Sequence, residues 1–360
     1  MSGATEVRNE RFNFLGFVKR IPLTTLLIGG LLVLVLIVGT IVGFSLTTEL
    51  TNILQRFTYW SVLVLAMVPS IQSGTGPNFA LPIGICAGLL AMVITMELQL
   101  MGYAFIVIAI LIAILIGCIF GYIYGRLMNA VKGSEMAIAT YTGFAITFFF
   151  SIIWLVYPIT NEFIGFFLGP GLRSIIRLET FAAEKILERL WAFSLFGVEI
   201  PTGTLLVFGL FATIVFLFFR SKSGVAITAA GMNPVFARAT GINVDRSRLI
   251  ANMMSTSLGA VGMIVYAQGF GFAQFYDTPL MMAFPAVAAI LVGGATASRS
   301  RIINVIVGTI LFHGLLTTAP PVIGRLLQDS DADIVNPVRL IVQFGVILYA
   351  LTKMSGGAKQ

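Results

Sequence analysis

The sequence predicts an all-α, polytopic integral membrane protein with about ten transmembrane helices, and three observations support that prediction. Hydrophobic residues make up 58% of the 360 positions and charged residues 10%, whereas soluble domains carry about 25% charged residues. The apolar residues gather in long runs, and a helix that crosses the bilayer core needs about 20 of them. Gly and Phe are abundant, with 37 and 30 residues, as expected of helices that pack against each other and against lipid.

The expected helices follow these apolar runs in chain order. The second run contains Arg56 near its start and is expected to be tilted or partly interfacial. The third is expected to be broken near its start by Pro77 and Pro82, and some later runs are short, as in broken or tilted helices. The assigned spans are Ile21–Ser45, Ile53–Gln72, Phe79–Leu98, Tyr103–Tyr124, Met136–Tyr157, Gly203–Phe219, Leu249–Ala273, Met281–Val292, Ile303–Val322 and Pro337–Leu351.

The charges outside the spans predict the orientation of the chain. Most of the 22 Lys and Arg residues fall in the N-terminal segment and in connections assigned to the cytosol, and most acidic residues fall on the other side. By the positive-inside rule both termini are therefore expected in the cytosol. We expect residues 1–20 and 354–360 to be cytosolic tails and 21–353 to form a single transmembrane domain. The net charge of +7 is then a topology signal, so we expect membrane lipid and no nucleic acid as a partner.

The cytosolic connection at residues 220–248 is longer than a simple turn requires. Asn233 and Pro234 are suited to the N-cap and first turn of a helix, so the sequence predicts a short helix at Val235–Thr240 that stops at Gly241. This helix could insert into a groove on a partner protein, or it could lie on the inner leaflet of the membrane.

The external connection at residues 160–202 is also expected to have structure of its own. Between Leu172 and Phe193, apolar residues recur at helical spacing and charged residues of both signs fall on the opposite face, which predicts an amphipathic helix. On the outer membrane face this helix could cover a gate and receive a delivering protein, or it could serve as an interfacial anchor. The two roles are compatible.

Polar residues within or at the ends of the spans are candidates for a pathway through the membrane. A polar solute in transit needs hydrogen bonds that are weak enough to release it, and aromatic rings can stack on its flat face. The broken start of the third span is the favoured region, because irregular backbone at membrane depth is tolerated where it lines a cavity. The candidate pathway residues are Gln72, Thr75, Asn78, Phe79, Gln268 and Gln274.

Signatures of catalysis and metal binding are missing from the sequence. There is no G-x-x-x-x-G-K-[ST] phosphate loop, no G-x-S-x-G or H-E-x-x-H motif and no paired carboxylates. We therefore predict no catalytic residue, metal or cofactor on this chain, and we expect Cys86 and Cys118 to be packing residues. An ion-coupled transporter could use Glu97 and His313. We expect Glu97 to reach interfacial water and His313 to be packed and hydrogen-bonded.

The cytosolic connection contains Ala229-Ala230-Gly231-Met232-Asn233-Pro234, then Ala237-Arg238, then Gly241-Ile242-Asn243-Val244. This pattern resembles the coupling loop of ABC importer permeases of the ribose or monosaccharide type, a family shared with branched-chain amino acid and nucleoside permeases. A second stretch, Ala286–Gly294, resembles the A-I-A-A-V-V-L-G-G run of the sugar permeases. The ATPase-coupling residues that the resemblance implies are Gly231, Asn233, Pro234, Ala237, Arg238 and Gly241.

The resemblance also implies a function and a set of partners. The chain would be a transport subunit, not an enzyme, in a bacterial inner (plasma) membrane, with ATP and Mg²⁺ bound by a separate cytosolic ABC ATPase. An extracytoplasmic solute-binding protein would deliver the cargo, and a second permease copy, identical or homologous, would complete the pathway. The cargo implied is a monosaccharide or related carbohydrate. The alternatives are a nucleoside or a branched-chain amino acid and, from a different class, an ion-coupled secondary transporter.

Overall fold

The computed structural model describes residues 22–159, 161–166 and 171–326, together with scattered positions between 337 and 352. Six of the described helices, α2, α6, α7, α9, α12 and α14, are long and apolar enough to cross a membrane, and α5 and α13 are shorter apolar helices. The helices are α2 (Leu23–Ile41), α3 (Leu46–Leu65), α4 (Met67–Gln72), α5 (Leu81–Glu97), α6 (Gly102–Ala130), α7 (Glu135–Val156), α8 (Ile186–Arg189), α9 (Thr202–Arg220), α10 (Lys222–Met232), α11 (Pro234–Ala239), α12 (Val244–Phe270), α13 (Thr278–Val292) and α14 (Ile302–Leu326).

These helices confirm the predicted all-α, polytopic class. Each predicted span up to Ile303–Val322 coincides with a helix or, for α3 and α4, with two consecutive helices. The last predicted span, Pro337–Leu351, falls largely outside the described residues, as do the two predicted tails at residues 1–20 and 354–360.

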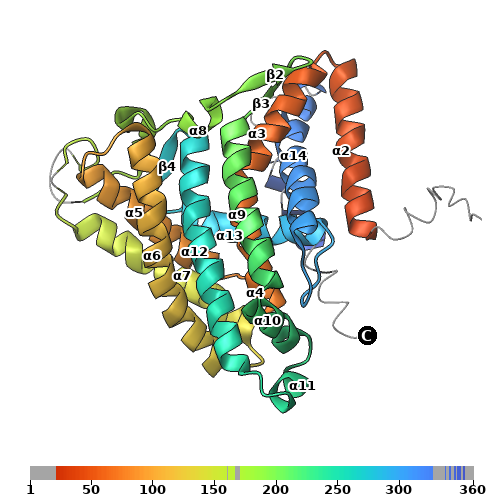
Figure 1. The fold of residues 1–360 in the computed structure, drawn as a ribbon. Helices are drawn as coiled ribbons and strands as arrows, with labels where there is room; N and C mark the ends of the chain where they lie inside the picture. Colours follow the sequence, from red (N-terminus) through yellow and green to blue (C-terminus); the bar gives the residue numbers. More distant parts are fainter. Residues whose placement is uncertain are drawn as a thin grey trace, which may run out of the picture.

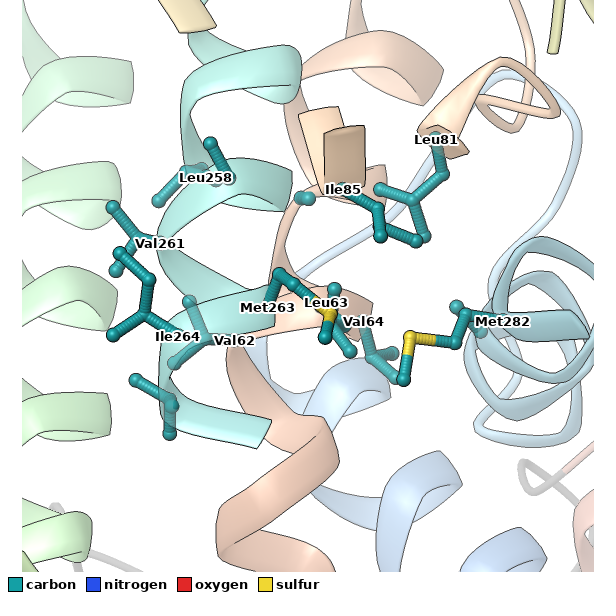
Figure 2. Packing of buried hydrophobic residues seen from close by; sticks show 14 of the residues in the cluster. Val62, Leu63, Val64, Leu81, Ile85, Leu258, Val261, Met263, Ile264 and Met282 are labelled. Atoms are coloured by element: carbon teal, nitrogen blue, oxygen red, sulfur yellow. The ribbon is translucent and has the colours of Figure 1, made fainter. Parts of the chain in front are cut away.

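Helix α12 lies at the centre of the fold (Figure 1). In the most apolar 18-residue stretch of α12, 72% of the residues are buried, against 22% in the corresponding stretches of α2 and α7. Small residues let neighbouring helices approach it closely: a Cβ atom on Gly88 of α5 or on Gly121 of α6 would collide with the backbone of α12. Figure 2 shows the core that results, with Val64, Ile85 and Met263 among its side chains.

The outer helices present apolar side chains at the surface. On α6, Leu111 and Leu115 are exposed, and on α7 Phe148 is exposed. In water such a surface would favour aggregation. In a bilayer the lipid tails surround these apolar side chains, so no further protein contact is required. The exposed apolar faces therefore agree with a protein that sits in a bilayer.

The break predicted near the start of the third span lies just before the helix, and Pro82 sits in the first turn of α5 without interrupting it. Residues 73–80 separate α4 from α5 and contain no helix, and Gly74 and Gly76 have φ of +76° and +80°. Glycine adopts this left-handed backbone without the steric penalty that a side chain would bring. The segment 73–80 is therefore irregular backbone placed between two buried helices.

The prediction of an amphipathic helix between Leu172 and Phe193, in the external connection, is wrong. The segment instead forms strand β1 (Ile175–Arg177), a 3₁₀ turn at Leu178–Phe181, the single turn α8, and the hairpin of β2 (Phe193–Leu195) with β3 (Val198–Ile200). β1 pairs antiparallel with β4 (Phe272–Gln274), which directly follows α12.

Local backbone geometry and burial explain this difference. Ala182, Lys185 and Trp191 adopt φ of +51°, +50° and +53°, which interrupts any continuous helix. The apolar side chains that suggested a helical stripe, such as Ile176 and Leu187, are buried against the body of the protein. Contact with α12 and β4 thus overrides the helical pattern of the segment.

Candidate functional site

Helix α11 projects from one end of the molecule (Figure 1), and its structure confirms the predicted short helix. Asn233 caps it, because its Oδ1 accepts a hydrogen bond from the backbone N–H of Phe236 at 3.0 Å. Ala237 is fully buried in a small cluster with Ala230 and Val244, which holds α11 against α10 and α12.

The outer surface of α11 is apolar. Val235 is 77% exposed and Phe236 is 61% exposed. Arg238 lies beside a surface hollow of about 270 Å³, together with Gly241 and Asp245. Exposed apolar side chains next to a hollow that is lined by charged residues are typical of a surface that binds another protein.

Helix α10 joins this end to the irregular segment 73–80 through backbone contact. A Cβ atom on Gly231 would collide with the carbonyl oxygen of Gln72, and one on Gly74 would lie 2.9 Å from the Cα of Gly231. Thr228 donates from Oγ1 to Gln72 Oε1 at 3.3 Å, while Gln72 Nε2 donates to the carbonyl oxygen of Ser300. Gln72 therefore links α4, α10 and the residues before α14, and it does not line the cavity described below.

Two ion pairs brace the same end of the molecule. Arg248 of α12 binds Glu135 of α7 at 2.6 Å and also donates to the carbonyl oxygen of Gly74 at 3.3 Å. These two side chains are 10% and 17% exposed, whereas those of the Lys132–Asp245 pair are 39% and 55% exposed. The more buried pair is also the one that contacts segment 73–80, through the hydrogen bond of Arg248 to Gly74. Because solvent screens this pair less, it should contribute more to stability than the exposed pair.

Segment 73–80 is held by a buried network of hydrogen bonds. Asn78 Nδ2 donates to Ser255 Oγ at 2.8 Å, and Ser255 Oγ donates to the carbonyl oxygen of Ala66 at 2.6 Å. Thr75 Oγ1 donates to the carbonyl oxygen of Ser70 at 2.9 Å. The predicted pathway residues Thr75, Asn78 and Phe79 are thus brought together, but as packed residues away from the cavity lining.

The other two predicted pathway residues lie near the opposite end of α12. Gln268 is fully buried, and its Oε1 accepts from the backbone N–H of Leu187 at 3.3 Å while its carbonyl oxygen accepts from Lys185 at 2.8 Å. Gln268 therefore fastens α8 to α12. Of the predicted set, Gln274 alone reaches the cavity lining in the described part of the chain.

A cavity of about 510 Å³ lies between α3, α12, α13 and α14. Aromatic rings form much of its wall. Trp60 and His313 stack with ring centres 4.1 Å apart and planes 21° apart, and Tyr266 meets Trp60 edge-on at 5.2 Å. Tyr266 also lies 4.3 Å from the Phe270 ring. Its lining comprises Arg56, Trp60, Tyr266, Phe270, Gln274, Asp277, Thr278, Met281, Met282, Pro285, His313, Leu316, Thr317, Pro320 and Pro321.

The cavity carries one positive and one negative side chain. The guanidinium carbon of Arg56 lies 4.4 Å from the centre of the Phe270 ring, a cation–π contact. Asp277 lies where the chain enters α13, just after Tyr276, which donates its hydroxyl to the carbonyl oxygen of Leu172 at 2.9 Å. A tyrosine hydroxyl is protonated at neutral pH and can therefore donate this hydrogen bond, and partial burial raises the pKa of Tyr276 further.

The predicted hydrogen bond of His313 is not found. The side chain is packed, with 4% exposure, but its Nε2 has no partner among the residues that the structure describes. Within the same described part, no group of three His, Cys, Asp or Glu side chains could hold a metal ion.

Most of the cavity lining escaped prediction from the sequence because it comes from separate elements. Arg56 and Trp60 are one helical turn apart, and a charge inside an apolar run is itself a signal of function. The proximity of those two residues to Asp277 and His313 depends on how α3, α13 and α14 pack.

Comparison with known proteins identifies the class. The family described as "Branched-chain amino acid transport system / permease component" matches residues 49–351, so the chain belongs to that permease family. Its family and its apolar helices make it a multi-pass inner-membrane protein.

Curated relatives are similar over shorter stretches. The probable ABC transporter permease protein YphD of Escherichia coli (strain K12) is 31% identical over 32% of this chain and 37% of its own. The guanosine ABC transporter permease protein NupQ of Bacillus subtilis (strain 168) is 31% identical over 40% and 42%, respectively. The nucleoside ABC transporter permease protein NupB of Lactococcus lactis is 28% identical over 36% and 33%. The matched stretches thus span less than half of each relative, and no solved structure matches the chain.

Proposed function

We propose that this chain is the permease subunit of an ABC importer, that it forms the translocation pathway for a small polar solute, and that it is not an enzyme. The observation that carries the proposal is α11, a capped helix with Val235 and Phe236 outward. Backbone contact through Gly231 joins it to the buried centre of the fold. An ATPase that grips α11 would move segment 73–80 directly, since close-packed backbone cannot absorb the displacement.

Three partners complete the proposed importer. A cytosolic ABC ATPase, which holds ATP and Mg²⁺, binds the α11 surface, including Gly231, Asn233, Pro234, Ala237, Arg238 and Gly241. A second permease copy, identical or homologous, encloses the pathway with this one. An extracytoplasmic solute-binding protein docks at the opposite end, where α8 and the β2–β3 hairpin lie. The relatives' names describe them as ABC permeases, which supports this assembly.

The proposed cargo is a monosaccharide or a related carbohydrate. The aromatic wall and polar groups of the cavity suit a ring that carries hydroxyl groups. A nucleoside is the second candidate, because NupQ and NupB are described as guanosine and nucleoside permeases. A branched-chain amino acid is the third, from the description of the family.

The test is affinity purification of the chain from its native host in mild detergent, followed by mass spectrometry and by uptake assays in proteoliposomes. We expect a P-loop ATPase and a secreted binding protein to copurify, and uptake to require ATP. Repeated recovery of the chain alone, with uptake that follows an ion gradient, would overturn the proposal in favour of a secondary transporter.

A further inference from the structure

One wall of the cavity is a platform of two stacked rings. The Trp60 indole and the His313 imidazole are nearly parallel at 4.1 Å. Phe312 meets His313 edge-on at 5.0 Å, and Tyr266 meets Trp60 edge-on at 5.2 Å. Edge-on neighbours hold both rings in place. The platform therefore presents aromatic surface to the cavity in a fixed orientation.

Packing alone does not call for a histidine in this platform. His313 is the only histidine of the sequence, it is 4% exposed, and its Nε2 has no partner among the described residues. A buried nitrogen without a hydrogen bond is costly and uncommon. A phenylalanine would stack on Trp60 as well, without that cost, so the unpartnered Nε2 needs another explanation.

The remaining lining indicates which solutes the cavity would accept. Arg56 and Asp277 contribute one charge of each sign, so the lining has no excess charge to offset that of a solute with a net charge leaving water. A zwitterionic amino acid has no net charge either, so it is the stacked Trp60 and His313 rings that favour a ring solute over it. Gln274, Thr278 and Thr317 offer groups that can exchange hydrogen bonds with hydroxyls. A volume of about 510 Å³ suits a single small solute.

We propose that Trp60 and His313 form a stacking platform for an uncharged ring solute, with a ring nitrogen of His313 hydrogen-bonded to that solute. The inference rests on the proposed transport function and adds to it. The permease itself then discriminates among solutes in transit, in addition to any selection by the protein that delivers them. His313 is a specificity-determining residue, and Trp60 supplies the surface against which the ring lies.

The test is ATP-driven uptake by the complete complex in proteoliposomes, with ribose, guanosine and leucine as the probes. His313→Phe keeps a ring and removes both nitrogens, His313→Gln keeps polar atoms and removes the ring, and Trp60→Leu removes half of the platform. Phe148→Leu is the control, because Phe148 of α7 is 61% exposed and lies outside the cavity lining and outside α8 and the β2–β3 hairpin.

We expect ribose or guanosine to be transported in preference to leucine. His313→Phe should raise the KM of that ring solute about tenfold with a smaller change in kcat, as for the loss of one buried hydrogen bond. Solute analogues that each lack one hydroxyl or amino group sharpen the test. In the wild-type complex, the analogue that lacks the group bonded to His313 should have a higher KM than the complete solute. In His313→Phe the two should have equal KM, because that hydrogen bond is already absent. His313→Gln should keep that difference in KM in part, and Trp60→Leu should raise KM for every analogue alike.

Two results would overturn the platform while leaving the transport function intact. One is a wild-type complex that transports solute while the His313 and Trp60 variants keep the KM and analogue profile of Phe148→Leu. The other is a preference for leucine. A complete wild-type complex with no ATP-driven uptake of any probe contradicts the proposed function itself. Should His313→Phe fail to assemble, His313→Gln and Trp60→Leu decide the matter.

Discussion

The two ends of α12 meet their neighbours in opposite ways. Near its first residues α12 is held by two ion pairs and by the packing of Val244 against Ala230 and Ala237. On the neighbouring α10, the backbone of residues 72–74 leaves no room for a methyl group on Gly231. Near its last turns the neighbours are large aromatic rings around a cavity of about 510 Å³. Close-packed backbone transmits a displacement, whereas a cavity with a defined lining can hold a solute. The comparison separates a region suited to mechanical coupling from one suited to recognition.

The difference also bears on segment 73–80. The sequence suggested that Thr75, Asn78 and Phe79 line a pathway, yet the structure packs them in a buried network beside Gly231 and Gly74. The segment meets α10 through Gly74 and α12 through Asn78, which fits a role in transmitting movement from α11. The predictions below, ordered from the largest expected effect to the smallest, test whether the two ends differ in this way.

Gly231→Ala is expected to have the largest effect. The new Cβ would collide with backbone atoms of Gln72 and Gly74, so α10 must shift at a cost of about 3 kcal/mol. We expect ATP-driven uptake to fall more than about tenfold and the Tm in detergent to drop. Gly209→Ala on α9, with no atom within 4 Å of the new Cβ, is the control and should behave as wild type. Full uptake by Gly231→Ala would show that this contact transmits nothing.

Arg248→Ala should destabilise the same end less. Removing Arg248 leaves Glu135 partly buried without its partner, which we expect to cost about 2 kcal/mol, below the range for fully buried pairs. Lys132→Ala breaks the exposed pair with Asp245 and should cost under about 1 kcal/mol. Thermal unfolding at low and high salt measures both. Equal losses of Tm in the two variants would contradict a special role for the buried pair.

Asn233→Ala tests α11 alone. Loss of the cap should weaken the helix by about 1 kcal/mol and reduce ATP-driven uptake several-fold, while the protein remains folded in the membrane. Asn243→Ala removes an equivalent cap from α12, where Oδ1 accepts from Arg246 N at 2.9 Å, and is the matched control. Asn233→Asp keeps the acceptor and should restore uptake. If both alanine variants lose uptake equally, α11 has no special part in coupling.

Glu188→Gln is expected to have the smallest effect and concerns the opposite end. Glu188 of α8 accepts hydrogen bonds from Tyr59 at 2.7 Å and from Gln55. Glutamine keeps one acceptor oxygen but turns its amide group toward the other donor, at a cost of about 0.5–1 kcal/mol. We expect a small loss of Tm and uptake within about twofold of wild type. A loss of uptake as large as that of Gly231→Ala would mean that both ends are mechanically coupled.

Short-range sequence signals predicted part of the candidate site well. The cap at Asn233, the helix that follows it and the break at Pro77 depend on residues a few positions apart, and all three are present in the structure. The external segment was predicted wrongly. Its apolar spacing fits a helix, but in the structure the same side chains are buried against β4 and α12. The cavity could not have been derived from spacing, because its lining spans more than two hundred positions of the chain.

The sequence by itself determined the membrane class, the order of the helices and the short capped helix α11. Apolar run length, glycine content and capping residues act locally, so no knowledge of the packing is needed to interpret them. Only the tertiary structure decided that Trp60 and His313 stack, that Arg56 and Asp277 share one cavity, and that Gly231 meets the backbone of Gln72. The first two contacts arise where α3, α12, α13 and α14 pack together, and the third arises where α10 meets the end of α4. Such meetings of distant elements are set by the packing of whole helices.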